Sequence, residues 1–177
     1  MSTAESRRER KKAGVRDRII SAAIGIFSER TIEQATVDEI AAAADVGKGT
    51  IYNYFQSKED IVVAFLVGIE RQVQGRVGRF ASAKGSLQQI LVSFLQFQLK
   101  LKRPHYQFVR VFLAQMFARG GSSSPWIAQL QEAIDPPLEH FFSTLQDRGL
   151  IREDIDRRDL IQFFKMLHVG LMTIWVM

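Results

Sequence analysis

The sequence has no cysteine, and this absence excludes several kinds of site at once. The chain has no disulfide bond, no cysteine-liganded zinc or iron–sulfur centre, and no thiol nucleophile. Proline is also scarce, with four in 177 residues, so little in the sequence interrupts helix formation. The longest apolar-rich run without a charge, residues 166–177, is too short to span a bilayer. The basic N-terminus lacks the apolar segment of a secretory signal, so we expect a cytoplasmic protein without a membrane partner.

Motifs for metal binding and catalysis are missing as well. The three histidines are far apart in sequence, and none shares a helix face with a second metal-binding residue. The serines at 122–124 lie outside any G-x-S-x-G pattern, and the sequence has no phosphate-binding P-loop or GxGxxG motif. We therefore expect no metal, no cofactor and no enzymatic activity.

The residues that are present predict an all-α protein. Apolar residues make up 46% and charged residues 24% of the chain, as in a folded globular protein. Apolar positions recur at helical spacing, and alternating strand patterns with hairpin turns are absent. We expect a first helix at about 15–29, a short second helix capped by Thr36 with Glu39 completing a capping box, and a third at 48–54. Ser57 is expected to cap a long helix from Lys58 to about Ala81.

Further helices are expected behind this headpiece. They cover residues 87–102, a segment after Pro104, residues 126–134 and 138–148, and residues 160–177. Pro136 and Pro137 are expected to break or kink the chain, and residues 120–125 to form a flexible loop. Gly149 is expected to end its helix in the left-handed conformation.

Residues 36–54 have the pattern of a helix-turn-helix. Ile51 and Phe55 are spaced to pack back onto the preceding helix, which leaves Lys48, Thr50 and Asn53 to point outward. In this geometry the second helix enters the major groove of DNA. Lysine donates to guanine, asparagine pairs with adenine, and threonine offers a hydroxyl or a methyl group. The pattern therefore predicts DNA recognition.

The residue string in this segment resembles the TetR family of bacterial regulators. The resemblance covers about residues 15–66 and is carried by Thr36, Ile40, Ala41, Ala44, Val46, Lys48, Gly49, Thr50, Ile51, Tyr52, Tyr54, Phe55 and Lys58. It implies that Thr36 caps its helix and touches phosphate, and that Tyr54 and Lys58 grip the DNA backbone. It also implies that bases or their methyl groups are read by Lys48, Gly49, Thr50, Tyr52 and Asn53.

Residues 1–14 have no apolar side chain to bury and are expected to form a flexible basic arm. For the rest of the chain, the resemblance implies a TetR-like architecture with a helix-turn-helix domain at 15–57 and a ligand-binding and dimerisation bundle at 58–177. It implies a homodimer that binds a palindromic, double-stranded DNA operator and is released by a small molecule. Family members usually have a ninth helix, whereas this sequence stops within an apolar run, so a short member and a truncated chain both stay open.

The net charge of +5 is unevenly placed. Residues 1–18 have seven basic and three acidic residues, whereas residues 19–60 have three basic and seven acidic ones. The headpiece is therefore neutral overall, and the arm is expected to touch phosphate or the minor groove, the alternative being a solvated tail. The segment from Arg71 to Gln131 has nine basic residues and no acid. It could attract an anionic effector, but we expect a solvated face, with Lys100, Lys102, Arg103 and Arg119 in the last turns of helices.

The resemblance to a TetR-like body implies a ligand cavity among the aromatic residues of the bundle, and such cavities are mostly apolar with few polar groups. Plain core packing is the alternative for the same residues, and His168 is expected as a hydrogen-bonded core or interface histidine in preference to a ligand sensor. The apolar stripe of residues 160–174 is expected to form the dimer face. The candidate ligand-binding residues are Phe94, Phe97, Phe108, Phe112, Met116, Trp126, Phe141, Phe164 and His168.

The sequence thus predicts a ligand-released repressor with a largely apolar effector. Two alternatives stay open: a DNA-binding regulator or activator that needs no effector, and a ligand-binding oligomer with a vestigial headpiece.

Overall fold

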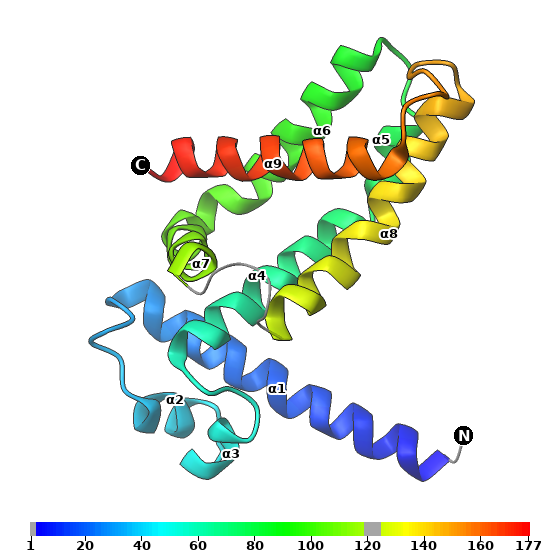
Figure 1. Ribbon diagram of the computed structural model, residues 1–177. Coiled ribbons are helices and arrows are strands. Elements are labelled where there is room, and N and C mark those ends of the chain that lie inside the picture. The colour runs from blue at the N-terminus through cyan, green and yellow to red at the C-terminus, as the bar shows by residue number, and fades with distance from the viewer. Residues whose placement is uncertain (1–2, 119–124) are drawn as a thin grey trace. The chain divides into compact units, whose positions relative to one another are not determined.

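The computed structural model describes residues 3–118 and 125–177, and every regular element within these ranges is helical (Figure 1). This confirms the all-α prediction. The chain divides into two compact units, Met1–Phe65 and Leu66–Met177, with the boundary inside helix α4. The elements are α1 Thr3–Glu29, α2 Val37–Ala43, α3 Lys48–Tyr52, α4 Lys58–Gln74, α5 Val77–Ala81, α6 Leu87–Lys102, the 3-10 turn η1 Arg103–His105, α7 Tyr106–Ala118, α8 Pro125–Asp147 and α9 Arg157–Val176.

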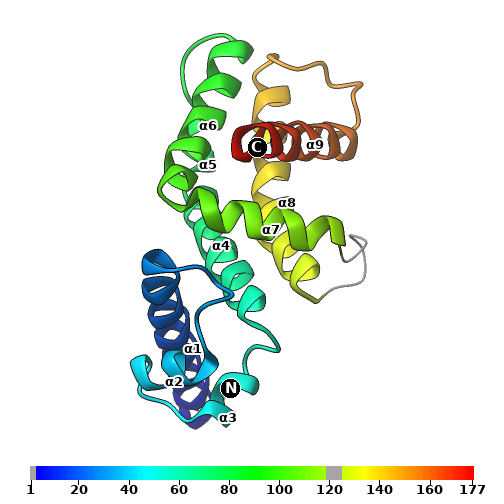
Figure 2. The same ribbon diagram turned by 90° about the vertical axis from the view of Figure 1, so that its left-hand side faces the viewer.

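The first unit is built around one buried face of α1. Ile19, Ala23 and Phe27 are buried along this face at helical spacing. Helices α2 and α3 follow α1 and complete the small bundle (Figure 2). The predicted capping box is present, since Thr36 Oγ1 accepts from the backbone N–H of Glu39 at 3.2 Å and Glu39 Oε2 accepts from the N–H of Thr36 at 2.8 Å.

Helix α1 begins at Thr3, whereas the sequence was expected to form a flexible arm up to residue 14 and a helix from about 15. The structure corrects this expectation by placing residues 3–14 inside the helix. The physical reason lies in composition, because alanine, glutamate, arginine and lysine are strong helix formers and no proline interrupts them. The basic residues of this segment are therefore presented on a helix.

The expected long helix from Lys58 to Ala81 is divided into α4 and α5. Helix α4 ends at Gln74, and α5 begins at Val77 after the turn at Gly75 and Arg76. Glycine is a poor helix former, and Val77 and Ala81 gain nearly complete burial after the turn. The break therefore redirects an apolar segment into the core of the second unit.

The second unit has a continuous aromatic and aliphatic core. Its most buried large side chains include Phe94, Leu138, Phe141 and Leu145. The rings of Phe94 and Phe141 lie 5.1 Å apart between centroids, a distance typical of favourable aromatic pairs. This core is formed mainly by α5, α6, α8 and α9.

Helix α8 runs through both prolines, so of the expected break or kink at Pro136 and Pro137 the break is wrong. A proline inside a helix costs about 3 kcal/mol or more. Full burial of a Leu or Phe side chain contributes about 1.5–3 kcal/mol, and Leu138, Phe141 and Leu145 are all buried just beyond the prolines. Burial on the second half of α8 therefore offsets the cost of continuing the helix. The expected loop at 120–125 falls almost entirely on residues outside those described.

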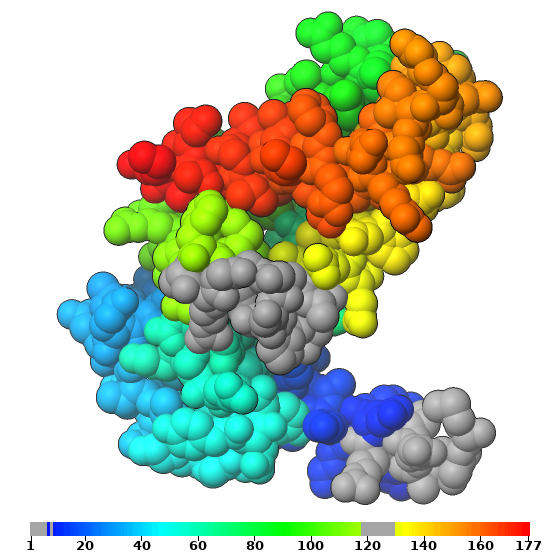
Figure 3. All heavy atoms as spheres, in the orientation of Figure 1, coloured from blue at the N-terminus to red at the C-terminus, as the bar shows by residue number. Residues whose placement is uncertain are grey.

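Helix α9 carries a row of apolar side chains on its outer face. Phe163, Met166 and Ile174 are 69%, 73% and 75% exposed, and Figure 3 shows α9 on the visible surface of the second unit. Within the described ranges, α9 alone is long and apolar enough to cross a membrane by length and composition, a test that helices of soluble proteins also pass. Its inner face contributes Ile161, Phe164 and Met172 to the protein interior.

Candidate functional site

Helices α2 and α3 form the predicted helix-turn-helix. Ile51 and Phe55 are 2% and 5% exposed and lie with Ile40 and Ala44 in the buried interior. The turn between the helices includes Asp45 with a positive φ of 53°, a conformation that aspartate tolerates better than most residues. Because one face of α3 is buried in this way, the other face is presented to solvent.

Four of the expected base-reading residues are on the exposed side of α3 or at its end. Lys48, Gly49, Tyr52 and Asn53 are exposed, with Tyr52 at 53%, and Thr50 is half-buried. Helix α3 is shorter than expected, since it ends at Tyr52 with Asn53 as its cap. Lysine, threonine, tyrosine and asparagine side chains at the end of a short exposed helix can all donate hydrogen bonds to base edges or phosphates.

Lys48 forms an ion pair with a residue of the preceding helix. Its Nζ atom lies 2.8 Å from Oδ2 of Asp38, and both side chains are exposed. The hydrogen bond and charge of Asp38 raise the pKa of Lys48. Solvent screens an exposed ion pair, so it is weak, and exchanging Asp38 for a DNA acceptor costs little.

The two residues expected to touch phosphate near α2 and α3 differ in exposure. Thr36 is exposed, but its hydroxyl donates to Glu39 Oε2 at 2.8 Å. Tyr54 is half-buried, with its ring centroid 6.4 Å from that of Phe55. Both residues lie at the edges of the helix-turn-helix, which suits backbone contact better than base contact.

Lys58 is the clearest departure from the expected site. Its Nζ atom donates to the carbonyl oxygens of Ile32, Glu33 and Ala35 at 2.5, 3.3 and 2.8 Å. A lysine ammonium has three N–H donors, so this set of carbonyls uses all of them. The side chain thus holds the loop between α1 and α2, and only the N-terminal backbone of α4 is left for a phosphate.

The second unit contains a cavity of about 260 Å³. Its wall is formed by α4, α6, α7, α8 and α9 and is mainly apolar. Five of the nine expected ligand-binding residues line it: Phe94, Phe112, Met116, Phe164 and His168. The rings of Phe94 and Phe164 are stacked, with centroids 5.6 Å apart.

Three of the expected residues pack elsewhere. Phe97 lies on the side of α6 that faces Phe80, with ring centroids 5.2 Å apart. Phe108 is buried beside His105, and Phe141 is fully buried in the core against Phe94. Neighbouring positions on one helix point in different directions, so aromatic content alone did not distinguish wall from core. The side chain of Trp126 lies outside the described residues.

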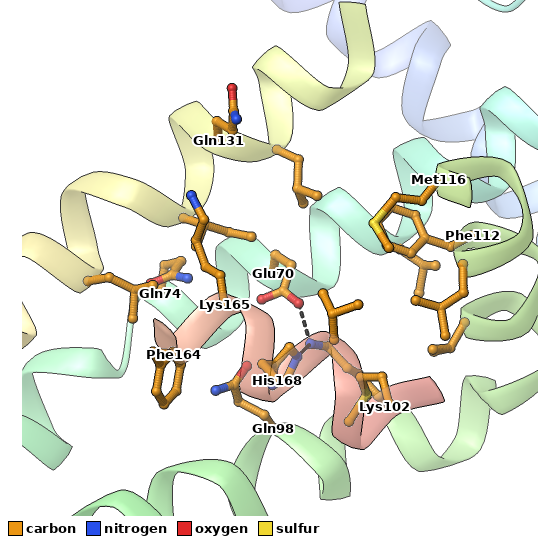
Figure 4. A pocket seen from close by; sticks show the side chains of 18 of the residues that line it. Glu70, Gln74, Gln98, Lys102, Phe112, Met116, Gln131, Phe164, Lys165 and His168 are labelled. Carbon is orange, nitrogen blue, oxygen red and sulfur yellow. Dashed lines mark hydrogen bonds and ion pairs between the residues drawn. The ribbon is translucent and has the colours of Figure 1, made fainter. Parts of the chain in front are cut away.

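A cluster of polar side chains interrupts the apolar wall. Glu70 of α4, Lys102 of α6 and His168 of α9 converge in Figure 4. Lys102 forms an ion pair with Glu70, and its Nζ atom lies 2.8 Å from Nε2 of His168. Glu70 and Lys102 are 9% and 5% exposed. The expectation that Lys102 belongs to a solvated face is therefore wrong.

The contact with Lys102 determines which nitrogen of His168 carries a proton. A lysine ammonium only donates hydrogen bonds, so Nε2 of His168 must accept and Nδ1 must carry the hydrogen. Burial and the charge of Lys102 hold the pKa of His168 well below its ordinary value. His168 is therefore neutral, and its Nδ1–H has no hydrogen-bond partner in the structure.

Two glutamines near this cluster also have unpartnered atoms. Gln74 Oε1 and Gln98 Nε2 are buried without a hydrogen-bond partner, and both residues line the cavity. The mainly aromatic set expected from the sequence does not include the lining residues Glu70, Gln74, Gln98 and Lys102. A signal was available, since Phe94, Gln98 and Lys102 follow one another at intervals of four on the buried side of α6.

Known proteins are similar to the helix-turn-helix segment and, at lower identity, to most of the chain. Residues 19–65 match the family model described as bacterial regulatory proteins, tetR family. The transcriptional repressor BepR of Brucella suis is 27% identical over 173 residues, which cover 93% of this chain and 81% of that protein. The fatty acid metabolism regulator protein of Bacillus subtilis is 46% identical over 46 residues, or 26% of this chain and 24% of that relative.

A solved structure shares the fold over nearly the whole chain. The TetR-family transcriptional repressor FadR of Thermus thermophilus, in complex with lauroyl-CoA, superposes with a TM-score of 0.73 at 20% identity. The match covers 91% of this chain and 82% of that protein. One conclusion follows from three observations: the helix-turn-helix with its exposed α3, the family match at residues 19–65, and this shared fold. Residues 19–65 match the DNA-binding domain of the TetR family, and over most of its length the chain is similar to a transcriptional repressor, so we conclude that it is a DNA-binding transcriptional regulator.

Proposed function

We propose that the protein is a repressor that a small molecule releases from DNA. In this proposal a homodimer binds a palindromic operator and leaves it when a largely apolar ligand occupies the cavity of the second unit. The observation that carries the proposal is the stretch of the chain that α4 spans. This helix begins at Lys58, directly after the helix-turn-helix, and its later residues Leu66, Glu70 and Gln74 line the cavity.

The exposed face of α3 supports DNA contact. We assign base reading to Lys48, Gly49, Thr50, Tyr52 and Asn53, and backbone contact to Thr36, Tyr54 and the amides at the start of α4. A helix N-terminus attracts phosphate through its unpaired N–H groups. Basic residues on the first turns of α1 would add sequence-independent affinity that falls with salt.

The outer face of α9 supports a dimer. Phe163, Met166 and Ile174 are each more than two-thirds exposed, and exposed apolar patches of this kind mark interaction sites. A reader of a palindromic site needs two recognition helices about 34–36 Å apart. A second copy of the chain, packed on this face, would supply the second recognition helix.

The wall of the cavity supports an apolar ligand. Phe94, Phe112, Met116 and Phe164 give it aromatic and thioether surfaces, which bind apolar groups and adapt to their shape. The Thermus thermophilus relative is described in complex with lauroyl-CoA. We therefore favour a ligand with an acyl or similar chain, and we place the protein in the cytoplasm, with its operator DNA.

Release requires that the ligand bind one conformation of the dimer better than the other. In the proposed mechanism, the ligand occupies the space beside Glu70 and Gln74 and favours a position of α4 that does not suit the operator. Ligand binding and release of the operator are then coupled, because α4 takes part in both. Without such differential affinity, no ligand could move the equilibrium.

A direct test measures operator binding with and without a candidate ligand. The DNA would be the region upstream of the gene, labelled for fluorescence anisotropy, and the first compound lauroyl-CoA. Sequence-dependent binding that weakens as the compound is added supports the proposal. Operator binding that no cavity ligand changes would indicate an effector-independent regulator, and absence of sequence-dependent binding would indicate a vestigial headpiece.

A further inference from the structure

The charged side chains of the cavity wall are already matched in pairs. Among the described residues, two acidic and two basic ones line the cavity. Lys102 is paired with Glu70, and Lys165 Nζ lies 2.8 Å from Asp135 Oδ1. His168 is neutral as well, because its Nε2 accepts from Lys102. The described charged residues at the polar end of the cavity therefore offer a ligand no net charge.

The atoms that lack partners are neutral hydrogen-bonding groups. Gln98 Nε2 and His168 Nδ1–H are donors, and Gln74 Oε1 is an acceptor. Gln98 is only 4% exposed, so water reaches its amide poorly. Buried polar groups of this kind are nearly always satisfied in a native state, which indicates that a bound molecule supplies the missing partners.

We infer that the part of the ligand enclosed by the cavity is uncharged and mostly apolar, with a hydroxyl or carbonyl oxygen that meets Gln98 and His168. This inference rests on the proposed function of the cavity and names the ligand's chemistry. A carbonyl or hydroxyl oxygen accepts from both donors, and a hydroxyl also has a hydrogen for Gln74. The carbonyl of an ester or thioester has the same accepting oxygen.

A free carboxylate is a poor fit for the same reasons. Its negative charge would be buried beside Glu70, whose carboxylate already takes the charge of Lys102. Burial of an uncompensated charge is costly, and such a group binds in its protonated form instead. The cavity thereby distinguishes neutral lipids from the acids that carry the same chain.

The test uses four compounds with the same chain: decanol, methyl decanoate, decanoate and decylammonium. Binding to the purified full chain is measured by titration calorimetry near neutral pH. Decanol and methyl decanoate are expected to bind on the order of a hundredfold more tightly than decanoate or decylammonium. Decanoate binding is expected to strengthen about tenfold for each pH unit lowered, since only the protonated acid enters.

Two single variants, each with a control variant, locate the selectivity in the proposed residues. Gln98→Leu should weaken decanol binding about tenfold, whereas Gln96→Leu, an exposed glutamine on the same helix, should not change it. Glu70→Gln leaves the charge of Lys102 unmatched, so the preference should shift from methyl decanoate toward decanoate. The double variant Glu70→Gln, Lys102→Met should prefer the neutral compounds again.

The outcomes separate this inference from the proposed function. Tight binding of decanoate, or no change of preference in Glu70→Gln, overturns the neutral-ligand inference and leaves the release of DNA by another ligand intact. Failure of all four compounds to bind also overturns it. Loss of the operator's sensitivity to every cavity ligand would instead overturn the proposed function.

Discussion

Lys102 Nζ lies 2.8 Å from Nε2 of His168, so a charged lysine and a neutral histidine share a hydrogen bond at the edge of an apolar cavity. The lysine is held in place by Glu70 on α4, and the histidine lies on α9. One buried polar cluster thus connects three helices around the proposed ligand site. Before any ligand binds, the charge of Lys102 is already matched by Glu70, and His168 already accepts a hydrogen bond from Lys102.

The cluster predicts a specific dependence of stability on pH. The pKa of His168 is held below its ordinary 6.5 in the folded state, so the unfolded chain takes up a proton first as the pH falls. The free energy of unfolding should be constant above about pH 6.5 and decrease below it, by at most about 1.4 kcal/mol per pH unit for this one group. Chemical denaturation at several pH values measures this slope.

His168→Gln provides the variant for that experiment, because glutamine keeps an acceptor for Lys102 but does not titrate. The slope below pH 6.5 should decrease in this variant. His105 also has a pKa lowered by burial, so His105→Gln is the matched control and should remove a smaller part of the slope. An unchanged slope in His168→Gln would show that the histidine is not held neutral by its surroundings.

Lys58 is predicted to act on stability more than on DNA affinity. Lys58→Met removes the donor to the carbonyls of Ile32, Glu33 and Ala35 and should lower the free energy of unfolding by about 1–3 kcal/mol. The exposed Lys84→Met is the control and should leave it unchanged. If Lys58→Met left stability intact and reduced the salt dependence of DNA binding by about one unit, the lysine would be a phosphate contact after all.

Asn53 and Lys48 are predicted to carry sequence preference. Alanine at either position should cost about 1–3 kcal/mol of operator affinity and relax the choice of base at one position of each half-site. Binding to unrelated DNA should change much less. Competition assays with single-base variants of the operator measure this difference, and a uniform loss over all sequences would assign these residues to the DNA backbone.

Met166→Glu on the outer face of α9 is predicted to separate the dimer. The side chain is 73% exposed in the single chain, so a charge there should leave the fold intact but disfavour an apolar interface. Sedimentation analysis should show a monomer with weakened operator binding. Val92→Glu, at an exposed apolar position on α6, is the control, and an unchanged dimer in Met166→Glu would place the interface elsewhere.

The sequence was most informative where a local rule decides the structure. Thr36 and Glu39 form the expected capping box, Gly149 has the expected positive φ, and Ile51 is buried as its spacing predicted. These features depend on neighbours within a few residues. They could be predicted because short-range hydrogen bonds and helical periodicity suffice to specify them.

The structure differs from the expectation where residues far apart in sequence determine it. The helix continues through Pro136 because Phe141 and Leu145 are buried in a core that other helices complete. Lys102 is buried because Glu70 and His168, far away in sequence, reach it. A pattern along one helix shows that a polar residue lies on the buried side. It does not show which residue of another helix it contacts there.

In the proposed mechanism, ligand binding and operator binding oppose each other through the dimer. The most direct measurement is the affinity of the cavity ligand for the protein alone and for the protein saturated with operator DNA. If the ligand releases the repressor, its dissociation constant should rise on DNA by the same factor by which the ligand weakens operator binding, typically about 5–150-fold. Equal affinity for the two forms would contradict the account.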